Sequence, residues 1–349
     1  MKIALDATYS AGKHLSGVGV YSRELMEGLA RLEPAVDWRW SYRPQHWREI
    51  LLGPSAPPSV KRRFLWESRQ PSCKLFHGLG QRLPSAFDKL PRRARTVATF
   101  HDLFVMTREY SSEEFRIRFT AQARQAAERA DAIIAVSQFT ADQVQELLGV
   151  ESQRLHVVPH GVRPLALPGR VEREQTILCV GALQLRKNTL GLLRAFERMP
   201  KDWRLILAGS QGYGYEHVIG PAIESSARRA DIELTGWVDD HALAKLYARA
   251  SIFAFPSRDE GFGIPVLEAM AAGVPVLASN TSSMPEVCGG AALLVDPGSV
   301  EAIADGLAAM ICDETLRSDL VARGRRRAAE FTWERCARST WQVYRALLD

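Results

Sequence analysis

Short apolar runs alternate with longer amphipathic stretches through the second half of the chain. Thr176–Val180 and Arg204–Ala208 have the length and composition of strands buried on both faces of a sheet. Between and after them, polar and apolar residues recur at helical spacing. Strands that alternate with helices in this way predict a parallel sheet covered on both faces. The other predicted elements of the series are a strand at Ile232–Thr235 and helices at Thr189–Arg198, Tyr215–Arg229 and Asp240–Arg249.

The first half of the chain carries the same kind of pattern. Lys2–Asp6 predicts an opening strand, and Tyr21–Leu32 predicts an amphipathic helix with three leucines on one face. Ser137 is expected to cap a helix that begins directly after a strand. The other predicted elements are strands at Cys73–His77, Thr96–Phe100 and Ala132–Val136, and a helix at Ser112–Arg129.

A stretch rich in proline, glycine and mixed charges, Arg163–Glu174, separates the two series and is typical of an interdomain linker. A chain of 349 residues is long enough for two domains that each bury a core. We therefore predict domains at residues 1–165 and 166–330, followed by a C-terminal helix over residues 331–349.

Residues 251–273 combine a strand, a glycine-rich loop and a helix. Ser251–Phe255 has the pattern of a buried strand, and Gly261 and Gly263 allow backbone to approach a ligand closely. Pro265 suits the first turn of a helix, where its missing N–H costs nothing. The N–H groups at such a helix start attract anions, phosphate above all.

Two carboxylates, Glu260 and Glu268, frame this loop eight residues apart. A carboxylate near bound phosphate is unfavourable unless it has a partner of its own. Sugar hydroxyls would be such partners, because a carboxylate accepts hydrogen bonds from neighbouring OH groups. On spacing alone, the alternative remains that Glu268 caps the helix and Glu260 is solvated in a turn.

The string E-G-F-G-I-P-V-L-E-A-M-A-A-G-V-P-V, which begins at Glu260, resembles the E-x7-E signature of retaining nucleotide-sugar glycosyltransferases of family 4 (group 1). The D-A-T and G-V-G-V-Y elements near the N-terminus and the F-H-D-L element look most like those of bacterial mannosyltransferases or related transferases of surface polysaccharide assembly. The resemblance implies an α/β GT-B fold, with two Rossmann-like domains facing across a cleft. It also implies an acceptor-side first domain, a nucleotide-sugar-binding second domain, and a C-terminal helix that crosses back onto the first.

The resemblance further implies roles for individual residues. Glu260 would hold hydroxyls of the donor sugar, Glu268 those of the ribose, and His101, at the end of a strand, would contact the transferred sugar. Arg186 and Lys187 belong to an R-K-N pattern between a strand and a helix, where two cations form an anion site; Ala182 departs from relatives with a basic residue there. The other expected donor-binding residues are Gly17, Gly19, Gly181, Val238, Gly261, Phe262, Gly263 and Ile264.

These assignments predict a metal-independent transfer with retention of configuration. No D-x-D pair occurs in the sequence, so Arg186, Lys187 and the helix start near Gly263 would neutralise the diphosphate, and the leaving phosphate would accept the acceptor's proton. No cofactor is expected, because the nucleotide sugar is a co-substrate. The partners expected are that sugar and a saccharide or lipid-linked acceptor, without nucleic acid.

Rival functions remain open. A sugar-nucleotide epimerase of the same fold would form product without acceptor, and a binding protein would bind donor without transfer. An NAD-dependent oxidoreductase would need a complete dinucleotide fingerprint, but Ser22 stands where the third glycine after Gly17 and Gly19 belongs. His156 and His160 are four residues apart, a metal spacing only on a helix, and the intervening V-V-P predicts a strand end instead.

Four of the eight tryptophans lie within residues 36–66, beside Lys61, Arg62 and Arg63. The alternatives are contact with the inner membrane, binding of a saccharide acceptor, or rings in the core with the arginines on a solvated face. The net charge of +5 specifies neither anionic ligand nor membrane. Five scattered cysteines, no signal peptide and no membrane-length apolar run predict a cytoplasmic protein, with a peripheral position at the inner membrane as the alternative.

Overall fold

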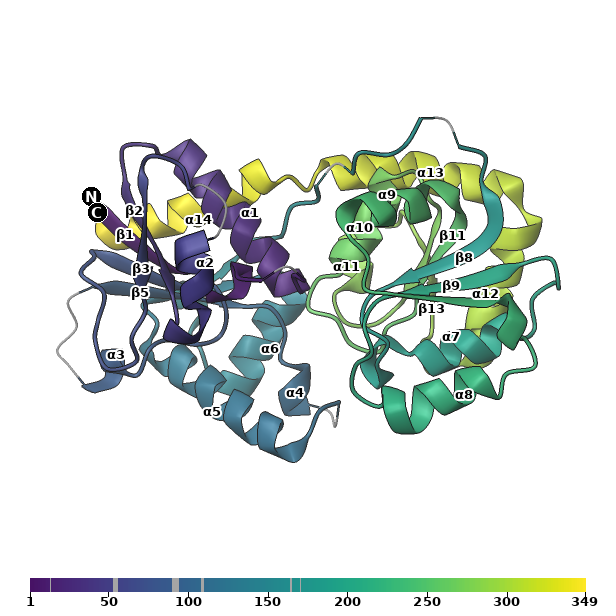
Figure 1. Cartoon of the computed structure of the whole chain (residues 1–349), viewed down its shortest axis with the longest axis horizontal. Coiled ribbons are helices and arrows are strands. Elements are labelled where there is room, and N and C mark those ends of the chain that lie inside the picture. The colour runs from purple at the N-terminus through teal and green to yellow at the C-terminus, as the bar shows by residue number, and fades with distance from the viewer. Residues whose placement is uncertain (13, 53–55, 90–93, 108–109, 164, 170) are drawn as a thin grey trace. The chain divides into compact units, whose positions relative to one another are not determined.

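The computed structural model describes the chain except residues 13, 53–55, 90–93, 108–109, 164 and 170 (Figure 1). It divides into two compact units, Met1–Gly161 together with Thr332–Asp349, and Val162–Phe331. Each unit contains one parallel sheet with helices on both sides. Along the described residues, no helix is both long and apolar enough to cross a bilayer.

The sheet of the first unit has the strand order β3-β2-β1-β4-β5-β6-β7, with parallel pairing throughout. Its strands are β1 (Lys2–Asp6), β2 (Asp37–Tyr42), β3 (Val60–Phe64), β4 (Leu75–Gly78), β5 (Arg95–Phe100), β6 (Ala132–Ala135) and β7 (Leu155–Val157). Its α-helices are α1 (Gly17–Leu32), α2 (Trp47–Leu52), α3 (Ala86–Lys89), α4 (Phe104–Thr107), α5 (Glu113–Arg129), α6 (Gln138–Leu148) and α14 (Trp333–Leu348).

Alternate residues of β1 supply the two cores of this unit. Ile3 and Leu5 point to the face covered by α1 and α14, whereas Ala4 belongs to the core under α5. Helix α14 lies against α1 where a glycine makes room, because a Cβ on Gly28 would come 3.1 Å from the Cβ of Ala337. The last helix of the chain is therefore part of the first unit.

The sheet of the second unit has the order β10-β9-β8-β11-β12-β13, again parallel. Its strands are β8 (Glu174–Val180), β9 (Arg204–Ala208), β10 (Ile232–Gly236), β11 (Ala250–Phe255), β12 (Val276–Ser279) and β13 (Leu293–Val295). Its α-helices are α7 (Thr189–Phe196), α8 (Gly220–Glu224), α9 (Asp240–Arg249), α10 (Ile264–Ala271), α11 (Met284–Cys288), α12 (Val300–Cys312) and α13 (Glu314–Ala329).

The structure corrects two parts of the predicted pattern. The single helix expected over Tyr215–Arg229 is wrong: a π-turn at Tyr215–Ile219 leads into the short α8, which Pro221 opens and which ends before Ser225. Strands β2 and β3 were not predicted, because their many polar residues hide the alternation of apolar and polar positions that is typical of a strand. Pro164 of the predicted linker lies outside the described residues.

The tryptophans of residues 36–66 divide between core and surface. Trp38 and Trp40 on β2 are buried, with Trp38 fully enclosed. Trp47 and Trp66 are about half exposed, at 47% and 50%. The segment is therefore part core and part surface.

Candidate active site

Three charged side chains meet at the carboxyl edge of the second sheet. Arg186 and Lys187 lie in a single 3₁₀ turn after β8, and Glu260 lies in the loop after β11, which pairs with β8 in the sheet. Arg186 Nη1 is 3.0 Å from Glu260 Oε2, and Lys187 Nζ is 2.5 Å from Glu260 Oε1. All three side chains are largely buried. The two predicted cations and the predicted carboxylate thus form one ionic cluster.

The backbone around this cluster is fixed by a third loop. The amide of Glu260 donates to Ser282 Oγ at 3.1 Å, and its carbonyl accepts from Ser283 Oγ at 2.9 Å. Arg186 Nη1 donates to the carbonyl of Asp259 at 2.5 Å, and the Arg186 carbonyl accepts from the amide of Arg258 at 2.8 Å. The carboxylate and its cations are therefore held by main-chain bonds as well as by charge.

Burial and charge act against each other in this cluster. Burial raises the pKa of Glu260, but the charges of Arg186 and Lys187 outweigh it and hold that pKa below its ordinary value. Burial lowers the pKa of Lys187, and Glu260 opposes the change. The Lys187 ammonium also lies 4.5 Å from the ring centre of Phe255, a cation–π contact that favours the charged form. Glu260 is therefore an ionised acceptor.

The glycine loop before α10 has a backbone conformation that favours glycine at its last position. Gly263 has φ +97°, a backbone conformation that strains a residue with a side chain, and a Cβ there would also displace the end of Met284, whose Cε would lie at 2.5 Å. No side chain caps this helix. Pro265 has no N–H, and the amide of Val266 already donates to the Gly263 carbonyl at 3.0 Å. At this helix start, neither Pro265 nor Val266 therefore has a free N–H to donate to an anion.

Glu268 lies one turn inside α10 and is buried. Its Oε2 accepts a hydrogen bond from the Tyr247 hydroxyl of α9 at 3.2 Å. Burial raises the pKa of Glu268, and Arg163 and Tyr247 partly offset the rise. Glu268 does not cap the helix, and Glu260 is not solvated in a turn. Both alternatives left open by spacing are wrong.

The other donor-binding candidates are distributed over both units. Gly181 follows β8, and a Cβ there would lie 3.5 Å from Lys187 Cε. Gly261 is buried beside Glu260, Phe262 packs edge-on against Phe331, and Ile264 opens α10. Val238 lies between β10 and α9.

In the first unit, α1 begins at Gly17, earlier than the helix predicted from Tyr21. Ser16 caps it by accepting from the amide of Gly19 at 3.3 Å. Gly17 is exposed in open space, whereas a Cβ on Gly19 would come 2.7 Å from the Tyr9 carbonyl. These glycines are therefore the first helical turn and not a loop before it.

His101 follows β5 directly and is buried in a cluster of rings. Its ring stacks on His160 at 5.4 Å between centroids and meets Tyr21 edge-on at 4.7 Å. Burial lowers the pKa of His101 to about 4, so the ring is neutral at pH 7. Nε2 donates to the Leu79 carbonyl at 2.9 Å, which leaves Nδ1 as the ring's acceptor.

A second buried histidine, missed by the sequence analysis, joins the first sheet to the last helix. His77 on β4 contacts the Tyr344 hydroxyl through Nδ1 at 2.5 Å and Thr99 Oγ1 through Nε2 at 2.8 Å. Tyr21 OH also bonds Thr99 Oγ1, at 2.9 Å. The sequence did contain a signal for His77. It ends the predicted strand Cys73–His77, so it was expected at the same carboxyl edge of the sheet as His101.

His156 lies on β7, whereas His160 takes part in the ring cluster. Within the ranges the structure describes, no three or more His, Cys, Asp or Glu side chains gather in a metal-binding arrangement.

Comparison with known proteins identifies the class. Solved structures with this fold include sucrose-phosphate synthase from Thermosynechococcus elongatus, with a TM-score of 0.81, 22% identity, and 100% and 99% of the two chains covered. Together with the two parallel-sheet units, this similarity confirms the predicted GT-B fold class.

Sequence comparison then gives the family. Residues 15–164 match the profile of Glycosyltransferase Family 4, and residues 168–327 match that of Glycosyl transferases group 1. The O-antigen chain mannosyltransferase B of Escherichia coli is 32% identical over a match of 303 residues, and the match covers 82% of this chain and 78% of the relative. The chain belongs to glycosyltransferase family 4 (group 1) and is a glycosyltransferase.

A further relative is the serotype-specific mannosyltransferase WbdA of Escherichia coli, 30% identical over 276 residues. The match covers 73% of this chain but 34% of WbdA, so the chain spans about a third of that longer protein.

Proposed function

We propose that this chain transfers a hexose, mannose from a GDP-mannose-like donor, to a saccharide or lipid-linked acceptor in the assembly of a bacterial surface polysaccharide. The name of the Escherichia coli relative, an O-antigen chain mannosyltransferase, supports mannose as the sugar and a surface polysaccharide as the product. The observation that carries the chemistry is the buried Arg186–Glu260–Lys187 cluster at the carboxyl edge of the second sheet.

The transfer breaks the bond between the sugar's C1 and a phosphate oxygen. The bonding pair goes to that oxygen, so negative charge grows on the diphosphate and positive charge on the sugar. Arg186 and Lys187 would stabilise the diphosphate in a buried, low-dielectric setting, where a fixed cation is worth more than in water. Two adjacent cations supply this charge without the D-x-D pair that the sequence lacks.

Glu260 would serve two purposes. Its ion pairs keep Arg186 and Lys187 in place, and an ionised carboxylate has further lone pairs that accept hydroxyls of the sugar. Glu268 would accept the ribose hydroxyls, with Tyr247 orienting it. The family resemblance supports both assignments.

His101 would contact the sugar as a neutral acceptor. With Nε2–H bound to Leu79, the ring can accept a sugar hydroxyl at Nδ1, but it is not a cation at pH 7. The sequence provides no evident nucleophile for double displacement. The acceptor hydroxyl would therefore attack C1 from the leaving-group side, and its proton would pass to the departing phosphate oxygen, so configuration is retained.

Peripheral contact with the inner membrane is part of the proposal. The exposed rings of Phe64 and Trp66 lie 5.8 Å apart, and exposed Lys61 and Arg63 lie on the same strand as Phe64. Aromatic rings beside basic side chains suit the interface of an anionic bilayer. Flotation with phosphatidylglycerol vesicles should recover the protein, and Trp66→Ser should weaken recovery. Equal recovery of both proteins would contradict this contact.

The function is tested with the purified chain, a panel of UDP-, GDP-, ADP- and TDP-sugars, and saccharide acceptors. Transfer from GDP-mannose in the presence of EDTA, with an α-linked product by NMR, is the expected result. An inverted product, or activity that EDTA abolishes and Mg²⁺ restores, would overturn the mechanism. Product formed without acceptor would indicate an epimerase, and donor binding without transfer or hydrolysis would indicate a binding protein.

A further inference from the structure

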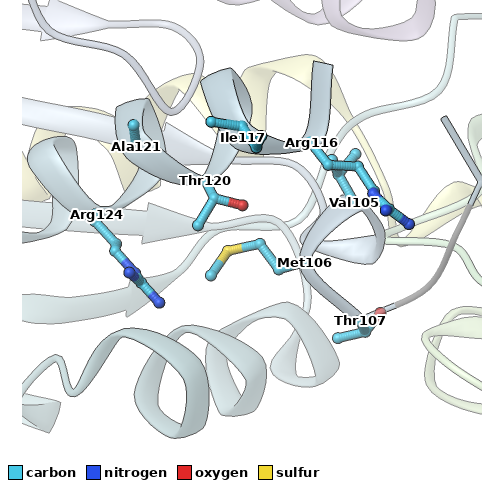
Figure 2. Close-up of a pocket in the computed structure, with 8 residues that line it drawn as sticks. All are labelled: Val105, Met106, Thr107, Arg116, Ile117, Thr120, Ala121 and Arg124. Carbon is cyan, nitrogen blue, oxygen red and sulfur yellow. The ribbon is translucent and has the colours of Figure 1, made fainter. Parts of the chain in front are cut away.

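A pocket of about 570 Å³ lies in the first unit between α4 and α5. Figure 2 shows Met106 of α4 in its centre, with Arg116 and Arg124 of α5 on either side. Val105, Met106 and Ile117 supply much of the apolar lining, and Ile117 is 66% exposed. The pocket is thus an apolar floor between two guanidinium groups.

Helical spacing brings the polar lining to one wall. Arg116, Thr120 and Arg124 follow one another at intervals of four residues, so they share a face of α5 (Figure 2). The two arginines are two turns apart, roughly 12 Å along the helix axis, which is within the combined reach of their side chains. Between them, the Thr120 hydroxyl adds a hydrogen-bond donor.

The charge of this wall is not neutralised at Arg124. Among the described residues no carboxylate pairs with the Arg124 guanidinium, and the side chain is exposed. Guanidinium groups bind phosphate oxygens through paired N–H donors.

None of the residues lining the pocket is aromatic, so it lacks the flat ring on which a sugar face packs.

The pocket also lies at the edge of the sheet where transfer is proposed to occur. Helix α4 begins at Phe104, three residues after His101 at the end of β5. A ligand in an open parallel sheet binds at the carboxyl ends of its strands. A group held between α4 and α5 would therefore be a short distance along the chain from the histidine proposed to contact the sugar.

We propose that this pocket binds the diphosphate of a lipid-linked acceptor, with Arg116 and Arg124 on the phosphate oxygens and Met106 and Ile117 against the first carbons of the lipid. The inference rests on the proposed function, because it names the acceptor class of that reaction. A lipid-linked diphosphate has both the phosphate oxygens that the two arginines can bind and the apolar carbons that Met106 and Ile117 can contact. A free sugar has neither.

The test compares two acceptors that carry the same saccharide, one on a short polyprenyl diphosphate and one on an uncharged alkyl chain. The wild type should have the lower KM for the diphosphate. Arg124→Ala should raise that KM about 10-fold, and the double variant with Arg116→Ala about 100-fold. KM for the uncharged acceptor and for the nucleotide sugar should not change.

Arg118→Ala is the matched control. Arg118 is on the same helix but points away from this wall, with its guanidinium carbon 5.5 Å from the ring centre of Phe115. It should leave both acceptor KM values unchanged. Equal rises for the two acceptors in Arg124→Ala, or no rise, would overturn the proposal, since a purely structural role does not distinguish charge.

Two further results would separate this proposal from membrane binding by the arginines and from failure of the proposed transfer reaction. If Arg124→Ala loses binding to phosphatidylglycerol vesicles while the diphosphate acceptor KM is unchanged, the arginines contact a membrane headgroup and the proposal is wrong. If the wild type transfers to neither acceptor, the proposed function fails, and calorimetric binding of a short prenyl diphosphate decides the site. Binding that Arg124→Ala weakens about 10-fold supports it, and equal binding overturns it.

Discussion

Two pairs of strand ends, one in each unit, differ in chemistry although both lie at the carboxyl edge of a parallel sheet. In the first, the carboxyl ends of β4 and β5 carry His77 and His101, which are neutral and enclosed by rings and hydroxyls. In the second, the ends of β8 and β11 carry a buried cluster of two cations and one anion. The ends of β4 and β5 are therefore held by hydrogen bonds between uncharged groups, and the ends of β8 and β11 by ion pairs. Elsewhere on the first edge, at the ends of β1 and β2, Asp6 and Arg43 also form a buried ion pair, at 3.2 Å.

The difference shows two ways of avoiding the free-energy cost of burying an unpaired charge. A lone buried histidine avoids the cost by remaining neutral, and burial lowers its pKa accordingly. Glu260 remains ionised because two cations lie within 3.0 Å of it. The first edge should therefore be sensitive to protons, and the second to the loss of any one of its charges.

Acid should produce the largest effect and should act on the first unit. Burial lowers the pKa of His77 to about 3 and of His101 to about 4, and that of His160 well below its usual value. The unfolded chain, with histidine pKa values near 6.5, then binds more protons between pH 6.5 and about 4, so stability is lost as pH falls through this window. His77 and His101 should each cost roughly 2 kcal/mol at pH 5, and His160 should add to the loss in the same direction.

The second unit should respond differently over the same range. The pKa of Glu260 is depressed, so its contribution is lost only below the ordinary glutamate value near 4.3. The pKa of Glu268 is raised, so its contribution increases as pH falls. Hydrogen exchange at pH 7 and pH 5, corrected for intrinsic rates, should show lost protection in β4 and β5 before β8 and β11. His160→Phe should reduce the loss; equal loss in both units would contradict the comparison.

Removal of one cation should produce the next largest effect, on catalysis by the second unit. Lys187→Ala takes away a fixed charge aimed at the leaving diphosphate, so kcat/KM should fall about 10²- to 10³-fold. Glu260 keeps Arg186 as a partner, so thermal melting should still show a folded protein. Lys201→Ala, which removes an exposed lysine of the same unit, is the control and should keep the wild-type rate. A Lys187→Ala enzyme with full activity would remove the basis of the proposed function.

Two buried tyrosines allow a smaller and more selective test. Tyr247→Phe removes the hydroxyl that donates to Glu268, so KM for the nucleotide sugar should rise about 5-fold with kcat unchanged. Tyr344→Phe removes the partner of His77 in the first unit, so it should cost about 1 kcal/mol of stability and leave that KM unchanged. Similar kinetics for the two variants would show that Glu268 does not depend on its tyrosine. Steady-state kinetics and urea unfolding measure both effects.

The fold was largely predictable because local signals agree with burial. Arg204–Ala208 and Asp240–Arg249 have the bounds predicted for a strand and a helix, and Ser137 caps α6 as predicted. Prediction was wrong where the local signal is mixed, as at Tyr215–Arg229 with its internal Gly220 and Pro221. It also missed β2, whose Trp38 and Trp40 are buried although the charged Arg39 separates them.

The candidate site was predictable in its members but not in its contacts. Arg186, Lys187 and Glu260 were identified from strand ends and from the family resemblance, and their catalytic roles stay predictions. Their mutual pairing depends on β8 and β11 being neighbours in the sheet, which no local pattern encodes. His160 was considered only as a metal ligand with His156, because ring stacking on His101 arises from residues far apart in the chain.

The helix caps of the two units should give the smallest effects and extend the comparison to single hydrogen bonds. Ser137, buried and uncharged, accepts from the amide of Thr140 at 3.0 Å, whereas Asp239, exposed and acidic, accepts from Ala242 at 2.8 Å. Replacing either with alanine should cost about 1 kcal/mol of stability. The aspartate also interacts with the helix dipole, so the cost of Asp239→Ala should decrease by a few tenths of a kcal/mol in 1 M salt, while that of Ser137→Ala should not. Urea unfolding at two salt concentrations measures this, with Asp239→Ser as the uncharged control; equal salt dependence of both alanine variants would contradict a contribution of the Asp239 charge to its cap.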